Sequence, residues 1–434
     1  MTTAAAPPPY SPACDAPAYT PCARAEERVL CARLRDSQRV PTGHFVQRSG
    51  PISIVVYDQE EGATTPIFRK RARIRGSIGL CQGLRSKAEE VVFKVEGRLE
   101  LAYTGGSSLL LHTIDDNYTL WSSTSGGVCP GELGFSAPLP CTYVSRDGRS
   151  HPLPPSFRSI HHGVPAIFAR SYYRVRVFIY KKRRGPFGLI AGTERSMMSF
   201  EYCPRTRPAA PFFPLDSFLS TIKHQPQEWI QSAIIVQSVE GSGLWPIHCH
   251  LFSPSVKVFG LTDKIPVHIL LAGPVDSLRQ FVPSNYDSTG TQKKEKDVAY
   301  AHYSSIRASI VREVMVEVNG VRVMRSESIG EGQLWPIPPS AHVCDCRAGT
   351  GTCQNMDWEG ELTCRKDITT GGFAAGNLWV QDVIQLDLTP LRPFTMKPAR
   401  MRVPVRFTTE PYLEQDTPDM DLLDELVRAV QPVR

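Results

Sequence analysis

The sequence predicts an all-β protein made of two antiparallel β-sandwich domains. The chain has 434 residues, enough for two or three ordinary domains. Its 37 prolines and 32 glycines favour short elements joined by turns over long helices. Several stretches also alternate between apolar and polar residues, which is the period of a strand with one buried face. Together these observations favour β structure throughout.

The first sandwich is expected to span residues 50–204. Between residues 91 and 101 one parity holds five apolar residues and the other holds every charged residue, a pattern that a helix would scatter around its circumference. The apolar set is Val91, Phe93, Val95, Leu99 and Leu101, and the charged set is Lys94, Glu96, Arg98 and Glu100. Further runs with strand character lie at residues 52–57, 71–80, 109–121, 173–179 and 197–202. This gives about six or seven strands, as expected of a β-sandwich.

The remaining segments divide the chain further. Residues 1–49 are rich in proline and alanine, which predicts a disordered tail. Residues 205–228 form a proline-rich linker, and residues 229–412 form the second sandwich, with a hairpin whose turn is Asn319-Gly320. Within this sandwich, the polar insertions are expected to be surface loops; they comprise residues 284–305 and 338–358. Residues 413–434 are acidic and then apolar, and they predict a short amphipathic helix.

Charge and hydropathy exclude several classes of protein. The net charge of +6 is modest for this length, so bulk charge does not imply nucleic-acid binding. No apolar run reaches the roughly 18 residues of a membrane-spanning helix. The first residues lack the features of a secretory signal, so we expect a cytoplasmic protein whose 12 cysteines are mostly free thiols.

Three phrases resemble α-arrestin-like proteins of fungi. They are Arg-Ile-Arg-Gly-Ser-Ile-Gly-Leu at residues 73–80, Leu-Pro-Pro-Ser-Phe at 153–157, and Val-Phe-Gly-Leu-Thr-Asp-Lys-Ile-Pro-Val-His at 258–268. The resemblance covers about residues 50–412. It implies the arrestin fold, in which two immunoglobulin-like sandwiches are joined by a short linker. It also implies a non-catalytic adaptor without a cofactor, which links membrane transporters or receptors to ubiquitin ligases and endocytosis. Such a protein is cytoplasmic and is recruited to the plasma membrane or endosomes.

A short motif in the N-terminal tail points to a ligase partner. Pro7, Pro8 and Tyr10 satisfy the Pro-Pro-x-Tyr pattern that WW domains bind. In that mode a preformed polyproline helix docks on an aromatic groove and the tyrosine fills a second pocket. A chance match within a proline-rich tail is the alternative interpretation.

Two groups of basic residues predict an anion-binding face on the first sandwich. Arg71, Arg73 and Arg75 are expected to project from the same side of one strand, and further basic residues gather on a second strand and its turn. The second group comprises Arg174, Arg176, Lys181 and Lys182, followed by Arg183 and Arg184. Phosphorylated tails or anionic lipid headgroups are the expected ligands. A solvated charged surface is the alternative.

Metal-site and catalytic patterns are weak. Cys344, Cys346, Cys353 and Cys364 miss the usual C-x2-C spacing of zinc sites, so free thiols are the preferred interpretation. His248 and His250 share one face of a strand and could share a metal ion, but a third ligand is not evident. No local catalytic motif is present. A nucleic-acid-binding sandwich, or an enzyme whose site leaves no local motif, remains an alternative to the adaptor.

Overall fold

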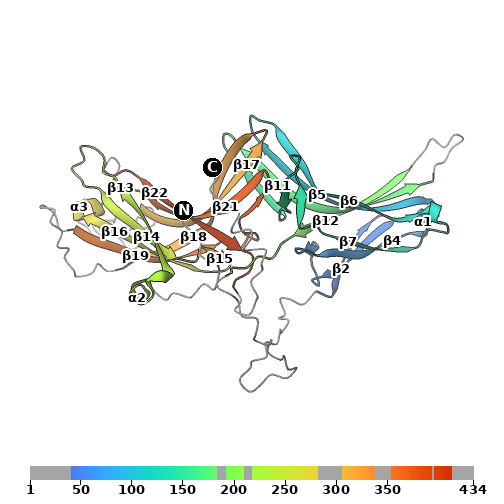
Figure 1. The fold of residues 1–434 in the computed structure, drawn as a ribbon, viewed down its shortest axis with the longest axis horizontal. Coiled ribbons are helices and arrows are strands. Elements are labelled where there is room, and N and C mark those ends of the chain that lie inside the picture. The colour runs from blue at the N-terminus through green and yellow to red at the C-terminus, as the bar shows by residue number, and fades with distance from the viewer. Residues whose placement is uncertain are drawn as a thin grey trace, which may run out of the picture. The chain divides into compact units, whose positions relative to one another are not determined.

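The computed structural model describes residues 41–182, 192–209, 218–281, 305–337, 353–392 and 395–412. In these ranges strands make up most of the chain and the helices between them are short (Figure 1). This confirms the predicted all-β fold of sandwich domains. No helix in the described ranges is long and apolar enough to cross a membrane.

The first sandwich consists of two sheets that pack face to face. One sheet has the order β1 (Gly43–Ser49), β2 (Ile52–Gln59), β4 (Arg73–Leu80), β7 (Glu132–Pro138). The other has the order β3 (Ile67–Phe68), β12 (Thr193–Tyr202), β11 (Ile167–Lys181), β5 (Ala88–Tyr103), β6 (Ser108–Ser122), and β10 (Phe157–His161) also pairs with β11. Their inward side chains form one core, in which Phe93 of β5 stacks on Phe135 of β7 at 4.2 Å between ring centroids. The outward side chains of the two sheets therefore lie on opposite surfaces of the sandwich.

Smaller elements join these sheets. α1 (Gln82–Arg85) lies between β4 and β5, and a turn of 3-10 helix (Ser123–Ser125) follows β6. β8 (Thr142–Val144) and β9 (Ser150–Pro152) form a separate two-stranded ribbon.

The second sandwich is one long sheet that curls on itself. Its order is β13 (Trp229–Val236), β14 (Ile247–Pro254), β16 (Ile265–Pro274), β19 (Cys353–Cys364), β18 (Val321–Ile337), β17 (Ile306–Val318), β21 (Leu378–Leu388), β22 (Ala399–Thr408), β15 (Val258–Gly260), and β20 (Phe373–Ala375) pairs with β21. Buried residues from both ends of this order, such as Leu251 of β14 and Phe407 of β22, belong to a single core. Two short helices, α2 (Phe218–Thr221) and α3 (Val275–Leu278), and a 3-10 turn (Pro226–Glu228) complete this part of the chain.

A third apolar cluster contains residues of both sandwiches. Leu99 of β5 and Ile167 of β11 belong to the same buried cluster as Val314 of β17 and Leu378 of β21. At its margin the rings of Phe157 and Phe373 meet edge to face at 5.3 Å. The two sandwiches therefore share a buried contact of their own, in addition to the linker.

The hairpin prediction is confirmed, whereas two segment boundaries are wrong. Asn319 and Gly320 both have positive φ, 52° and 79°, as a type I′ turn requires, and they join β17 to β18. However, β1 lies within residues 1–49, because Gly43–Ser49 pairs with β2 instead of belonging to the tail. Residues 353–358, expected in a loop, begin β19. The expected C-terminal helix at 413–434 lies outside the described residues.

Candidate binding face of the first sandwich

Two of the three predicted arginines of the first group lie side by side. Arg73 and Arg75 are exposed on β4, while Ile74 between them is fully buried in the core. Arg71 precedes β4 in a turn and has a φ of 61°, so the prediction that it continues the strand is wrong. The alternation of apolar and polar residues located β4 correctly. It did not show that Arg71 adopts a left-handed backbone conformation, which places this residue outside the strand.

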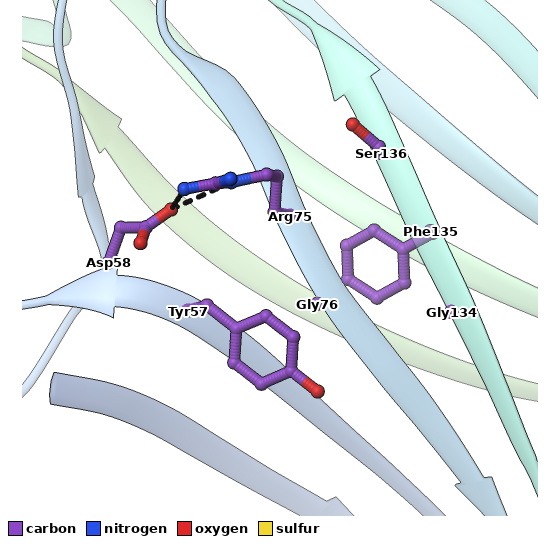
Figure 2. A pocket seen from close by; sticks show the side chains of 7 residues that line it. All are labelled: Tyr57, Asp58, Arg75, Gly76, Gly134, Phe135 and Ser136. Carbon is purple, nitrogen blue, oxygen red and sulfur yellow. Dashed lines mark hydrogen bonds and ion pairs between the residues drawn. The ribbon is translucent and has the colours of Figure 1, made fainter. Parts of the chain in front are cut away.

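The outer side of this sheet carries a hollow of about 630 Å³ beside Arg75 (Figure 2). Its lining consists of Tyr57, Asp58, Arg75, Gly76, Gly134, Phe135 and Ser136. We call the surface formed by Tyr57, Arg73, Arg75 and Ser136 the β4 face. Gly134 is exposed and an added Cβ would meet nothing closer than 4.0 Å, so the absence of a side chain there leaves the hollow open.

Asp58 and Ser136 orient the two arginines. The Nε and Nη2 atoms of Arg75 donate to Oδ2 of Asp58 at 2.9 and 2.7 Å (Figure 2). Nε of Arg73 donates to Oγ of Ser136 at 3.2 Å. Asp58 itself has a φ of 62°, a conformation that aspartate tolerates better than most residues. Together with Asp58, the β4 face therefore combines two guanidinium groups, one carboxylate and two hydroxyl groups, of which the Tyr57 hydroxyl donates to Oγ of Ser77 at 3.2 Å.

The sequence did not indicate Tyr57, Asp58 or Ser136. They come from β2 and β7, and only the strand register brings them next to β4: Arg75 lies opposite Ser136, and Gly76 lies opposite Val56, which precedes Tyr57. The alternation of each strand alone could have shown that Tyr57 and Ser136 point outward, but not that they are neighbours.

The second basic group belongs to the other sheet and does not join the β4 face. Arg174 and Arg176 project outward from β11, on the opposite surface of the sandwich. Nε of Arg174 donates to Glu96 at 2.5 Å, Arg98 also bonds to this carboxylate, and Arg176 lies 3.7 Å from it. These arginines surround an internal carboxylate, so a single basic face made of both groups does not exist.

The carboxylate of Glu96 is buried beneath the guanidinium groups that surround it. Its side chain is only 1% exposed. Burial alone would raise its pKa, but the hydrogen bonds from Arg174 and Arg98 more than offset this and lower the pKa to about 2. Glu96 is therefore ionised at neutral pH, and its charge is balanced by the surrounding guanidinium groups.

The lysines at the end of β11 are also placed on that sheet. Nζ of Lys181 lies 2.6 Å from Oε1 of Glu194, and the backbone amide of Lys182 donates to the carbonyl of Lys87. Arg183 and Arg184 lie outside the described residues, as do Pro7, Pro8 and Tyr10 of the tail motif.

Two of the candidate zinc cysteines cannot share an ion. Cys353 and Cys364 stand at opposite ends of the 12-residue strand β19, roughly 36 Å apart at about 3.3 Å per residue. Cys344 and Cys346 lie outside the described residues. Among the side chains that the structure describes, no group of three or more histidines, cysteines or carboxylates could hold a metal ion.

The histidine pair is arranged as the alternation predicts. His248 and His250 point to one side of β14, and Cys249 between them is fully buried on the other side. Burial raises the pKa of the Cys249 thiol to about 12. This thiol is therefore protonated and inaccessible, and it takes no part in any chemistry of the histidines.

Comparisons with known proteins identify no relative of this chain. No protein-family model matches the sequence, and a search of curated proteins finds no match.

Proposed function

We propose that the protein is an arrestin-like adaptor that binds phosphorylated cytoplasmic tails of membrane proteins through the β4 face. The Pro-Pro-x-Tyr motif of the N-terminal tail recruits the WW domain of a ubiquitin ligase in this proposal. The observation that supports it most is that Arg73 and Arg75 project from the same side of β4, with Arg75 and the hydroxyl group of Ser136 lining the hollow.

The spacing of the two arginines suits a phosphate group. Residues two apart on a strand project from the same side about 6.6 Å apart. A phosphate monoester carries nearly two negative charges and three acceptor oxygens, so it can accept hydrogen bonds from two guanidinium groups at once. The ligand side chain next to the phosphorylated residue can then enter the hollow that Gly134 lines.

The ion pair between Asp58 and Arg75 does not block such a ligand. Asp58 uses only Nε and Nη2 of Arg75 in the bonds described above, which leaves the Nη1 edge of the guanidinium for a second acceptor. The side chains of Arg75 and Asp58 are 54% and 28% exposed, and exposed pairs of this kind contribute at most about 1 kcal/mol. An incoming phosphate therefore competes with a weak internal partner.

The phrases that resemble arrestins have defined structural roles here, which supports the fold part of the proposal. Residues 73–80 are β4, and residues 258–268 comprise β15, a turn and the start of β16. In that turn the backbone amide of Gly260 donates to Asp263 at 2.6 Å. In the remaining phrase, residues 153–157, the carbonyl of Pro154 accepts a hydrogen bond from the buried hydroxyl of Tyr173.

The proposal is tested by fluorescence anisotropy with a short fluorescein-labelled peptide that carries one phosphoserine, alongside its unphosphorylated twin. Each arginine near an anionic group contributes on the order of 1 kcal/mol, so the double change Arg73→Ser and Arg75→Ser should weaken binding about thirtyfold at low salt. The matched control is Arg158→Ser with Arg195→Ser. It removes the same charge from exposed positions on β10 and β12 and should leave binding unchanged.

Three results would count against the proposal. Equal losses in the two double variants would mean that only the net charge matters. Equal binding of the two peptides would remove the role of phosphate. If the protein bound phosphatidylserine vesicles but not the phosphopeptide, the β4 face would be a membrane-binding surface. The ligase arm is tested separately with Tyr10→Ala, which should abolish WW-domain binding and leave phosphopeptide binding intact.

A further inference from the structure

Two imidazole rings lie next to each other on the outer side of β14 in the second sandwich. The rings of His248 and His250 are 6.4 Å apart between centroids and their planes differ by only 10°. His248 is exposed and His250 is half-buried. Both rings reach solvent from a regular strand of the sheet, so their Cβ positions are held by the hydrogen bonds of β14 to β13 and β16.

The residues opposite this pair on the two neighbouring strands carry no charge. Across the strands, His248 lies opposite Ile235 of β13 and Ala272 of β16. His250 lies opposite Ala233 and Leu270. None of these four residues is a lysine or arginine that would repel a cation, and the two alanines are too short to cover the rings.

Gln231 of β13 holds the ring of His250. Its side-chain nitrogen lies 2.7 Å from Nδ1 of His250. With the amide turned by half a rotation, its oxygen accepts the Nδ1 proton and Nε2 presents a lone pair to solvent, which is the arrangement of metal-ligating histidines.

We propose that His248 and His250 form a two-histidine binding site for a borderline divalent transition-metal ion, of the Zn²⁺ and Ni²⁺ class. Metal–nitrogen distances of about 2.0–2.1 Å require the two Nε2 atoms to come within roughly 3–4 Å of each other. In this proposal the exposed His248 side chain rotates toward His250 while the backbone of β14 stays in place. Water molecules, or a donor group from a bound partner, complete the coordination sphere. This site is on the second sandwich and does not depend on the proposed function.

The test uses Ni²⁺ as the probe, because this ion favours imidazole nitrogen and is not reduced by thiols. The full chain is first alkylated with iodoacetamide, so that accessible cysteines elsewhere cannot bind the ion; Cys249 is fully buried. Calorimetric titration should then show one site that is lost in the double variant His248→Ala and His250→Ala. Residues that only orient a metal ligand contribute about 10- to 100-fold to metal affinity. A residue that binds the ion directly contributes at least as much, so each single histidine variant should weaken Ni²⁺ binding at least tenfold.

Controls separate this site from general histidine binding. His112→Ala removes an exposed histidine on β6 of the first sandwich and should leave the titration unchanged. Gln231→Ala should weaken binding by less than either histidine variant. The proposal is wrong if the double variant binds Ni²⁺ as the unchanged chain does, or if His112→Ala weakens binding as much. Circular dichroism of each variant excludes unfolding as the cause of a loss.

Discussion

Replacing Glu96 with glutamine should destabilise the first sandwich and change its response to acid. The carboxylate is buried, and its pKa is about 2 in the folded protein against an ordinary 4.5. The difference corresponds to about 3 kcal/mol of stability at neutral pH. Because the folded-state pKa is the lower one, this contribution is complete above about pH 4.5 and is lost as the pH falls toward 2. Glu96→Gln should therefore lose about 3 kcal/mol at neutral pH and much less near pH 2.

Urea unfolding followed by circular dichroism at neutral pH and at about pH 3 measures both effects. Glu201→Gln is the matched control, because it makes the same chemical change at an exposed position of β12 on the same sheet. A loss below about 1 kcal/mol at neutral pH, or a pH dependence equal to that of the unchanged chain, would refute the reasoning. Arg174 and Arg176 would then be available for ligands after all.

Three further variants examine other parts of the account. Asp382→Asn should destabilise the second sandwich by about 3–5 kcal/mol in urea unfolding, because it leaves the buried Arg312 without its ionic partner at 2.8 Å; an effect under about 1 kcal/mol would contradict this. Gly134→Val should fill the hollow and weaken phosphopeptide binding in the anisotropy assay without a loss of thermal stability, and unchanged binding would exclude the hollow from the site. Asp58→Asn should tighten phosphopeptide binding by about threefold to fivefold, since the internal competitor of Arg75 contributes at most about 1 kcal/mol, and asparagine also accepts the positive φ; weaker binding would mean that Asp58 mainly positions Arg75.

The strands could be predicted from the sequence because each has one buried face. The parity of residues 91–101 matches β5, in which Val91, Phe93 and Val95 are buried. The Asn319-Gly320 turn was predictable for a local reason as well, since both residues tolerate positive φ. Such signals arise within a few consecutive residues, and they do not depend on the rest of the fold.

The arrangement of strands into sheets could not be predicted in the same way. Period-2 alternation shows which residues of a strand share a side, but it does not show which sheet the strand joins. For this reason Arg73 and Arg174 were expected on one face, although they lie on opposite surfaces. Glu96 illustrates a second limit: its alternation places it on the outward side, yet the long side chains of Arg98 and Arg174 cover it.

Photo-cross-linking from the β4 face tests the central claim most directly. Tyr57 beside the hollow and Tyr180 on β11 of the opposite sheet are almost equally exposed, at 42% and 41%. Benzoylphenylalanine is placed at one position or the other in the full chain, which is then irradiated with the phosphoserine peptide. The account predicts a cross-linked product from position 57 that excess unlabelled phosphopeptide suppresses, and none from position 180. Products from position 180 alone, or equal yields from both positions, would contradict it.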